Sequence, residues 1–420
     1  MSFLTGLKCI RCDASFPVEP RFDGCPNCRP KTPSNLTPTY DYAGIQRAFS
    51  KDALGDRPLN MWRYHEFLPP DMSEAPVLEE GMTPLVHCPD LGAKLGVPSL
   101  YLKDESRNPT GSFKDRLAVV ALGMAGRFSA HTVGVSSTGN AGAAAAAYSA
   151  RKGLRCVVLT VKGAASAMVT QIRAYGAMVV ATEKMEDRWT LLQAAIQRLG
   201  WYPTSPFFGP PIGSNCYGVD GYKTMAYEVC EQLDWRAPEW CVLPVAYGDA
   251  LYGMWKGFDE FAEMGYVKSR PRMAAGETAG SLEAAMREGV DAIPVKAAPS
   301  PSVASSINVA QSTYQALHAL RASSGLAAAA EDEELLELQA ELASREGIYA
   351  EPSSLAALAA IRKLRARGEI LKTETVVGLI TATGLKDPDA TASSLGEIPV
   401  VSGNLEALLE TLGESYDYKP

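Results

Sequence analysis

Residues 108–116 read Asn-Pro-Thr-Gly-Ser-Phe-Lys-Asp-Arg, a turn that runs directly into a helix. Turn-forming residues lead to Gly111, and we expect Ser112 to cap a helix that begins at Phe113. Lys114 then lies in the first helical turn, at the positive end of the helix dipole. This position can lower the pKa of the amine and suits a nucleophile that forms a Schiff base, although an exposed lysine on a turn is the simpler alternative.

A second motif follows the next predicted strand, in Val-Gly-Val-Ser-Ser-Thr-Gly-Asn-Ala-Gly at residues 133–142. The predicted strand ends in residues with hydroxyl side chains, and a helix is expected to begin near Gly139. Hydroxyls and free backbone N–H groups at a helix N-terminus form an anion site, which fits a carboxylate or a phosphate. The Asn140 amide adds a donor to oxygen. An ordinary helix cap is the alternative interpretation.

Two further apolar strands end in small or hydroxyl residues, within 242–253 and 376–388. The first passes through Gly248 into a helix and forms another candidate anion cradle. Asp249 is ill placed beside a phosphate and is expected to cap the helix with its side chain turned away. The second ends at Thr381, whose hydroxyl can face a ligand at the carboxyl edge of a sheet. A hydroxyl satisfied within the fold is the alternative there.

Strands and helices alternate along the chain from Leu100 onward, which predicts an α/β fold with mostly parallel sheets. The expected strands cover residues 100–103, 132–136, 155–160, 178–181, 240–245 and 375–381. The expected helices cover residues 113–127, 139–152, 165–175, 187–199, 219–233, 250–264, 331–346 and 353–365. Residues 289–302 are expected to form a surface loop, and residues 30–40 a linker rich in Pro and Thr.

Four cysteines near the N-terminus form two Cys-x2-Cys pairs separated by twelve residues: Cys9, Cys12, Cys25 and Cys28. Two such pairs can place four thiolates tetrahedrally around Zn²⁺. Four thiolates fill the coordination sphere, so the expected role of the metal is structural. A metal-free ribbon or redox-active thiols are the alternatives.

Composition limits the classes of function. The 420 residues carry 40 Lys and Arg against 48 Asp and Glu, a formal net charge of −8. This balance disfavours a nucleic-acid partner, which requires a basic surface. No apolar run approaches a membrane span, and charge and cysteine appear too early for a signal peptide. We therefore expect a cytoplasmic protein with no membrane partner and with reduced thiols.

The motifs, in this order, resemble the pyridoxal-phosphate enzymes of fold type II, the tryptophan synthase β-like group, and most closely the threonine synthases. The resemblance extends over nearly the whole chain and includes the N-terminal cysteine pairs. Besides the two motifs quoted first, it is carried by Glu-Gly-Met-Thr-Pro-Leu at 80–85 and by residues 220–233, 306–320, 345–361 and 384–388.

The resemblance implies roles for particular residues. Lys114 matches the lysine that holds pyridoxal 5'-phosphate as a Schiff base and shuttles protons, and Phe113 is expected near the cofactor. Asn140 matches the partner of the cofactor's ring hydroxyl, and Thr381 matches the hydroxyl partner of the pyridine nitrogen. Two loops complete the implied site. The substrate carboxylate loop comprises Ser137, Thr138, Gly139 and Asn140, and the cofactor phosphate loop comprises Ala246, Tyr247, Gly248, Asp249 and Ala250.

The chain departs from the family pattern in three places. The phosphate loop lacks the usual first Gly and Asn, and Ala382-Thr383 stand where the C-terminal signature usually has Gly-Asn or Gly-His. Residues 215–218 lack an arginine expected near a substrate phosphate, which Arg173 or Arg188 could replace.

These departures leave the substrate open. The first hypothesis is γ-elimination on O-phosphohomoserine followed by addition of water at Cβ, giving threonine. The alternative is β-elimination or β-replacement on another serine- or threonine-like amino acid, in specialised metabolism. A catalytically silent homologue that acts as a binding or regulatory protein is the minor alternative. The leaving group, the incoming nucleophile and any allosteric effector stay open.

The resemblance also implies an architecture of two α/β domains around a cofactor cleft. We expect a cysteine ribbon at 1–35, an extension at 36–98, a smaller domain at 118–205, and a larger domain combining 70–117 with 206–420. The smaller domain is expected to close over a small-molecule amino-acid substrate, and the chain to form a homodimer.

Overall fold

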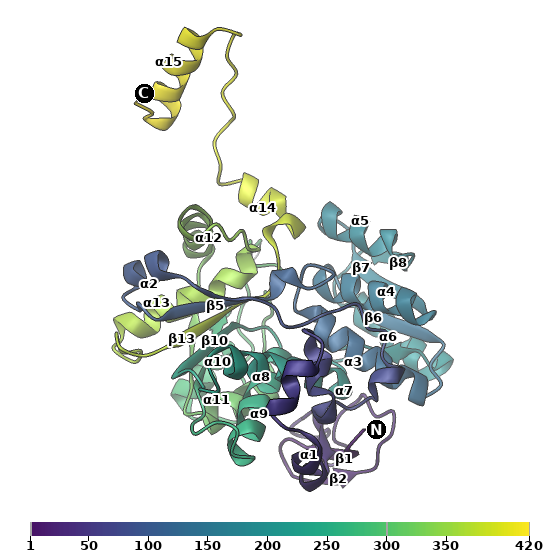
Figure 1. Ribbon diagram of the computed structural model, residues 1–420. Coiled ribbons are helices and arrows are strands. Elements are labelled where there is room, and N and C mark those ends of the chain that lie inside the picture. Colours follow the sequence, from purple (N-terminus) through teal and green to yellow (C-terminus); the bar gives the residue numbers. More distant parts are fainter. Residues whose placement is uncertain (1, 300, 420) are drawn as a thin grey trace.

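The computed structural model describes residues 2–299 and 301–419, and its body contains two sheets rich in parallel strands (Figure 1). The larger sheet has the order β12-β11-β10-β13-β5-β4, in which only β4 is antiparallel to its neighbour. The smaller sheet has the order β8-β7-β6-β9, all parallel. The predicted α/β class with parallel sheets is confirmed.

The strands of the larger sheet are β4 (Leu85–His87), β5 (Leu100–Asp104), β10 (Trp240–Pro244), β11 (Arg272–Glu277), β12 (Leu326–Ala329) and β13 (Val376–Ile380). The smaller sheet comprises β6 (Thr132–Ser136), β7 (Arg155–Val161), β8 (Met178–Thr182) and β9 (Tyr202–Pro203). The helices of the body are α2 (Pro89–Leu95), α3 (Lys114–Arg127), α4 (Asn140–Lys152), α5 (Ser166–Ala174), α6 (Asp187–Leu199), α7 (Cys216–Val219), α8 (Lys223–Gln232), α9 (Asp249–Glu263), α10 (Ser281–Glu288), α11 (Tyr314–Ala322), α12 (Asp332–Glu346) and α13 (Ala356–Ala366).

The central strands of the larger sheet are buried on both faces, which is why β10 and β13 are apolar throughout. Successive side chains of β10 enter different cores. Cys241 and Leu243 pack with residues of α8, α9 and α11, whereas Trp240 and Val242 pack with residues of α2, α12 and α13. Helices therefore cover both faces of the sheet, and a ligand can reach it only at the ends of the strands.

The smaller sheet packs against alanine-rich α4. Ala143, Ala145 and Ala146 share a core with Val135 and Val158 of the neighbouring strands. Small side chains allow the helix to approach the sheet closely, so this alanine run is a packing surface.

The N-terminal residues form a separate antiparallel sheet in which β1 (Leu4–Cys9) lies between β2 (Ser15–Phe16) and β3 (Leu36–Tyr40). The prediction of a linker over 30–40 is therefore wrong for its second half. Leu36, Pro38 and Tyr40 are buried on one face of β3, while the threonines between them are half-buried. Pro38 hid this alternation, because proline usually marks a loop. Helix α1 (Tyr42–Ala48) follows.

Most predicted elements lie within two residues of their observed bounds, but some differ. The helix expected over 219–233 is divided into α7, a 3-10 turn at Asp220–Tyr222, and α8. The one expected over 353–365 begins as a 3-10 turn at Pro352–Leu355 before α13. Strands β11 and β12 were not predicted, because their alanine-rich sequences lack the β-branched residues that favour strands.

The C-terminal part leaves the body after α14 (Pro388–Ala392), and α15 (Leu405–Tyr416) stands apart from it (Figure 1). No residue of α15 is buried. Among the described residues, none of the helices combines the length and apolar character needed to cross a membrane.

Candidate active site

A cavity of about 520 Å³ opens where the carboxyl ends of β10 and β13 face the carboxyl end of β6. Every residue predicted to contact a cofactor or a substrate lines it: Phe113, Lys114, Ser137, Thr138, Gly139, Asn140, Ala246, Tyr247, Gly248, Asp249, Ala250 and Thr381. Segments more than 100 residues apart in sequence therefore meet at one place.

Lys114 is positioned by bonds between its loop and the end of β13. The Phe113 N–H donates to the Thr381 carbonyl at 2.9 Å, and the Thr383 N–H donates to the Gly111 carbonyl at 3.2 Å. The expected cap by Ser112 is wrong: α3 begins at Lys114 after Phe113, without a side-chain cap. The Ser112 hydroxyl is buried without a partner among the described residues.

Asp115 closes the turn in place of Ser112. Its carboxylate accepts from the Thr110 N–H at 2.7 Å and from the Thr110 hydroxyl. Burial of Asp115 raises its pKa to about 7, although both bonds from Thr110 lower it. The turn before α3 is thus held by the carboxyl of Asp115, a residue in the first turn of α3.

The Lys114 ammonium faces the cavity above an aromatic floor. It lies 4.4 Å from the centre of the Phe113 ring, which stacks on Tyr222 at 5.2 Å. Burial lowers the pKa of Lys114, while the carboxylates of Asp249 and Glu351 raise it. Burial is therefore the chief cause of the lowered pKa of Lys114. A lysine with a lowered pKa can act both as an amine and as an ammonium.

The loop at the end of β6 forms the opposite wall. The Ser137 hydroxyl accepts from the Gly139 N–H at 3.1 Å and the Gly142 N–H at 2.9 Å, so it caps α4. Thr138 is half-buried at the cavity. The Asn140 amide donates to the Glu351 carboxylate, and its own oxygen is buried without a partner among the described residues. An unpartnered amide oxygen at a cavity indicates a ligand there.

Glu351 is a site residue that the motif analysis missed. It is 2% exposed and lines the cavity. Besides the Asn140 amide, its carboxylate accepts from the Thr381 hydroxyl at 3.4 Å. Burial raises the pKa of Glu351, and the bond from Asn140 lowers it. The sequence feature that could have identified Glu351 is its position directly before Pro352, at the start of an alanine-rich helix that is buried.

The loop before α9 forms the base of the cavity. Gly248 has φ of 75°, and a Cβ there would lie 2.2 Å from the Ala316 side chain, so only glycine fits. The first turn of α9 presents N–H groups that have no partner within the helix. The expected cap by Asp249 is wrong, because Gly248 is the N-cap and no side chain caps α9. As expected, the Asp249 side chain turns away, and it accepts from the Ser214 N–H at 2.9 Å and hydroxyl at 2.7 Å, and from Gln315.

These contacts extend to the N-terminal sheet. Gln315 bridges Asp249 and Asn35, whose amide donates to the Gln315 oxygen at 3.3 Å and to the Ser214 carbonyl at 3.1 Å. The backbone carbonyl of Asn35 accepts from the Ile10 N–H between the first two cysteines. The loop before α9 is therefore joined to the cysteine pairs by a continuous chain of hydrogen bonds.

The cavity fits pyridoxal phosphate. Its volume is that of an ordinary cofactor site. A lysine amine, an unpartnered amide oxygen and a helix N-terminus behind a glycine turn offer partners for an aldehyde, a ring hydroxyl and a phosphate.

The four N-terminal cysteines also meet, with their sulfur atoms all within 4.8 Å of one another. Cys9 lies 3.8 Å from Cys28, and Cys12 lies 3.7 Å from Cys25, sulfur to sulfur. Tetrahedral zinc with Zn–S bonds of about 2.3 Å requires sulfur separations of about 3.8 Å. This donor set fits a structural zinc ion.

Comparison with known proteins bears on the active site. The family profile described as "Pyridoxal-phosphate dependent enzyme" matches residues 77–382. A threonine synthase of Methanocaldococcus jannaschii is 35% identical over 414 residues, covering 97% of this chain and 99% of the relative. A threonine synthase of Methanosarcina acetivorans is 35% identical over 412 residues, covering 97% and 98%.

Solved structures share the fold. Diaminopropionate ammonia lyase from Escherichia coli, with an aminoacrylate intermediate, superposes with a TM-score of 0.63 at 18% identity, covering 77% of this chain and 94% of that one. A threonine deaminase from Solanum lycopersicum superposes with a TM-score of 0.61 at 19% identity, covering 74% and 86%. At this identity the likeness concerns the fold alone.

Proposed function

The chain belongs to the pyridoxal-phosphate dependent enzymes and, within them, to the threonine synthases, and from this premise we propose that it converts O-phosphohomoserine and water to threonine and phosphate. It is a pyridoxal-phosphate dependent carbon–oxygen lyase. The observation that carries the proposal is the convergence of Lys114, Asn140, Thr381 and the α9 N-terminus on one cavity.

Bound pyridoxal phosphate supplies an electron sink that makes the substrate Cα–H acidic. Lys114 would hold the cofactor and then, once released by substrate, accept the Cα proton on Nζ and return it at a neighbouring carbon. Its lowered pKa supports this role, because the neutral amine is a base and the ammonium an acid. Burial of the site limits loss of that proton to water.

The other side chains orient the reactants. Asn140 would accept from the ring hydroxyl through its amide oxygen, which has no partner among the described residues, while Glu351 holds its amide nitrogen. Thr381 would offer a neutral hydroxyl to the pyridine nitrogen, and its bond with Ser354 at 2.8 Å sets its direction. In the 137–139 loop the Ser137 and Gly139 N–H groups are used within the fold, so the Thr138 N–H would be the one that holds the substrate carboxylate. The N–H groups of residues 246–250 would hold the cofactor phosphate.

The assay for this proposal supplies the cofactor and then O-phospho-L-homoserine, and measures phosphate and threonine. Equal release of both supports the proposal. If the cofactor binds but only O-phospho-L-serine or another serine-like substrate reacts, the alternative of β-elimination or β-replacement takes its place. If no amino acid reacts, the alternative of a catalytically silent homologue takes its place.

We also propose that Cys9, Cys12, Cys25 and Cys28 hold a structural zinc ion. Their sulfur separations support tetrahedral coordination. The role is structural because four thiolates leave no position for a substrate.

Replacing Cys25 with serine is expected to release the zinc and to lower Tm by about 5 °C or more. Metal content by atomic emission and Tm by calorimetry check this, and reconstituted cofactor should still bind. Cys156→Ser is the matched control, because Cys156 is also buried but lies outside the cluster. An unchanged metal content, or a fall in Tm no larger than the control's, would contradict the zinc site.

We infer a division into domains from the positions of the two sheets. The strands of the smaller sheet lie within 118–205, and those of the larger sheet lie within 70–117 and 206–420. Closure of the smaller domain would bring the 137–139 loop onto the substrate. The homodimer and the cytoplasmic location stay predictions.

A further inference from the structure

Asn35 is a buried amide between the cysteine ribbon and the active-site cavity. It directly precedes β3 and is 3% exposed. Its backbone carbonyl accepts from the Ile10 N–H at 3.3 Å, and the neighbouring Ser34 carbonyl accepts from the Cys25 N–H at 3.0 Å. Backbone groups of both cysteine pairs therefore hold the segment from which the Asn35 side chain projects.

The Asn35 side chain determines which end of the Gln315 amide faces the loop before α9. The Asn35 nitrogen donates to the Gln315 side-chain oxygen at 3.3 Å, so the Gln315 nitrogen points the other way. That nitrogen donates to the Asp249 carboxylate at 2.5 Å and to the Tyr247 carbonyl at 3.2 Å. A reversed Gln315 amide would place its oxygen against these two acceptors, which is costly for buried groups.

The carbonyls of the same loop are turned away from the cavity. The Tyr247 carbonyl also accepts from the Thr313 hydroxyl at 2.6 Å, and the Ala246 carbonyl accepts from the Ser312 hydroxyl at 2.6 Å. Neither hydroxyl residue lines the cavity. Because a trans peptide unit points its carbonyl and its N–H in opposite directions, the N–H groups of Tyr247 and Gly248 face away from these donors, on the cavity side. Neither N–H has a partner among the described residues.

The Asp249 carboxylate would compete with a phosphate if it were released. Ser214 and Gln315 hold it with three hydrogen bonds. Asn35 donates to both of these residues, since its second acceptor is the Ser214 carbonyl at 3.1 Å. A carboxylate that turned back to the N-terminus of α9 would be stabilised there and would repel a phosphate.

We propose that Asn35 is a positioning residue for the cofactor phosphate: through Gln315 and Ser214 it keeps the loop at 246–250 open to that phosphate. The N-terminal segment thereby sets the affinity for the phosphorylated form of the cofactor. The inference rests on the proposed function for the cofactor and its loop, and it is independent of which amino acid reacts.

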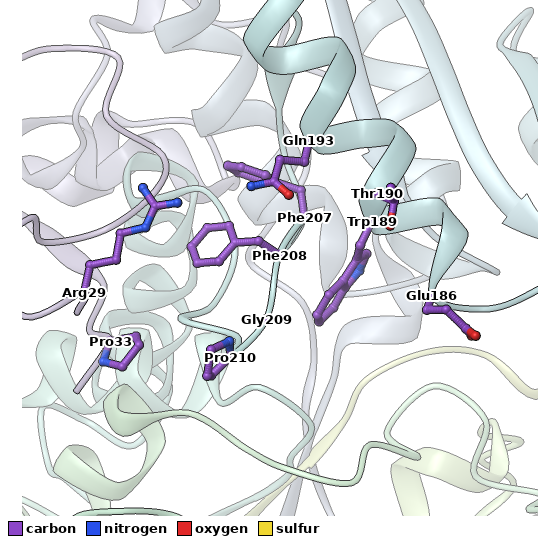
Figure 2. A pocket seen from close by; sticks show the side chains of 10 residues that line it. All are labelled: Arg29, Pro33, Glu186, Trp189, Thr190, Gln193, Phe207, Phe208, Gly209 and Pro210. Carbon is purple, nitrogen blue, oxygen red and sulfur yellow. The ribbon is translucent and has the colours of Figure 1, made fainter. Parts of the chain in front are cut away.

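Arg29 provides a matched control on the same segment. Its guanidinium pairs with Asp23 and lies 4.9 Å from the centre of the Phe208 ring. It borders a second cavity of about 380 Å³, next to Trp189 and Gln193 of α6 (Figure 2). Since Arg29 does not line the active-site cavity, Arg29→Ala removes a contact between the segment and the body without touching the bonds of Asn35.

The test measures the dissociation constants of pyridoxal 5'-phosphate and of pyridoxal, which lacks the phosphate, by equilibrium dialysis of the full-length protein. The ratio of the two constants reports what the phosphate contributes to binding. The variants are Asn35→Ala, Asn35→Asp, Gln315→Met and Arg29→Ala. Phosphorus NMR of the bound pyridoxal 5'-phosphate reports the surroundings of its phosphate directly.

Asn35→Ala is expected to weaken pyridoxal 5'-phosphate about 10-fold and pyridoxal less than about 2-fold. Asn35→Asp keeps the acceptor of the Leu36 N–H and loses both donated bonds, so its selective loss should be at least as large. Gln315→Met keeps the volume and should show the same selectivity. The phosphorus resonance should move in these three variants, and Arg29→Ala should match the wild-type protein in every measurement.

An unchanged ratio in both Asn35 variants would overturn the positioning role and leave the proposed function standing. Equal weakening of both ligands would overturn it as well, because a general disturbance of the fold does not select the phosphate. If the wild-type protein binds pyridoxal as tightly as its phosphate, the loop at 246–250 is not the phosphate site and the positioning role fails with it. If the wild-type protein binds neither ligand, the proposed function fails.

Discussion

Replacing Lys114 with alanine is expected to abolish turnover, by about 10⁴-fold or more, because the base that moves the Cα proton is removed together with the covalent link to the cofactor. Phosphate release from O-phospho-L-homoserine measures the loss. Borohydride treatment followed by mass spectrometry measures the link, since reduction fixes the cofactor to the lysine that holds it. The wild-type protein should carry the added mass on the peptide that contains Lys114.

The variant should bind the cofactor reversibly and gain no mass on reduction. Lys162→Ala is the control, because the Lys162 side chain is 75% exposed and does not line the cavity. It should keep both activity and the added mass. Cofactor fixed by borohydride to the Lys114→Ala protein would mean that another lysine holds it, and the assignment would be wrong.

The second large effect is expected two residues further along the same motif. Arg116 is fully buried, and its guanidinium donates to both oxygens of Glu105 at 2.7 Å and to Glu228 at 2.6 and 2.8 Å. Lys103 pairs with Glu228 at 2.7 Å. Although burial raises it, the pKa of Glu228 is held at about 2 by Arg116 and Lys103. Two positive and two negative charges thus balance inside the core.

Arg116→Met leaves one negative charge uncompensated in this network, and we expect the free energy of unfolding to fall by about 3–5 kcal/mol. Urea denaturation followed by circular dichroism measures the change. The difference in free energy of unfolding between the wild-type protein and the variant should become smaller below neutral pH. Without Arg116 the carboxylates of Glu105 and Glu228 gain protons more readily in the folded variant than in the folded wild-type protein, and this removes the uncompensated charge.

Arg127→Met is the matched control, since Arg127 is the exposed last residue of the same helix. Its effect should stay within about 0.5 kcal/mol. Equal stability of Arg116→Met and Arg127→Met would show that the buried charges contribute nothing to folding.

Asn140 and Thr381 could be predicted because each follows an apolar strand, and parallel strands bring such positions to one edge of a sheet. Lys114 could be predicted from its place at the start of a helix, and its role from the resemblance of its motif to the family. Glu351 could not be predicted in this way. It follows no strand, and its partners Asn140 and Thr381 are joined to it only by the folded chain.

The choice between Arg173 and Arg188 shows the same limit. Both are arginines near helix ends on the smaller-sheet side, and local sequence gives no reason to prefer either. Only the orientation of α5 and α6 decides which one reaches the cavity. Strands β11 and β12, which were not predicted, also depend on the rest of the fold. Their alanine-rich segments form strands because they pair with neighbouring strands of the larger sheet.

The hydrogen bonds from Asn35 to Gln315 and Ser214 limit how the N-terminal segment can be lost or replaced during evolution. A chain that lost its first 35 residues would lack the donor to the Gln315 side-chain oxygen and to the Ser214 carbonyl, beside the loop that precedes α9. Any descendant without the cysteine pairs would need new residues to occupy that place. The N-terminal segment and residues 214 and 315 are therefore expected to be inherited or replaced as one unit.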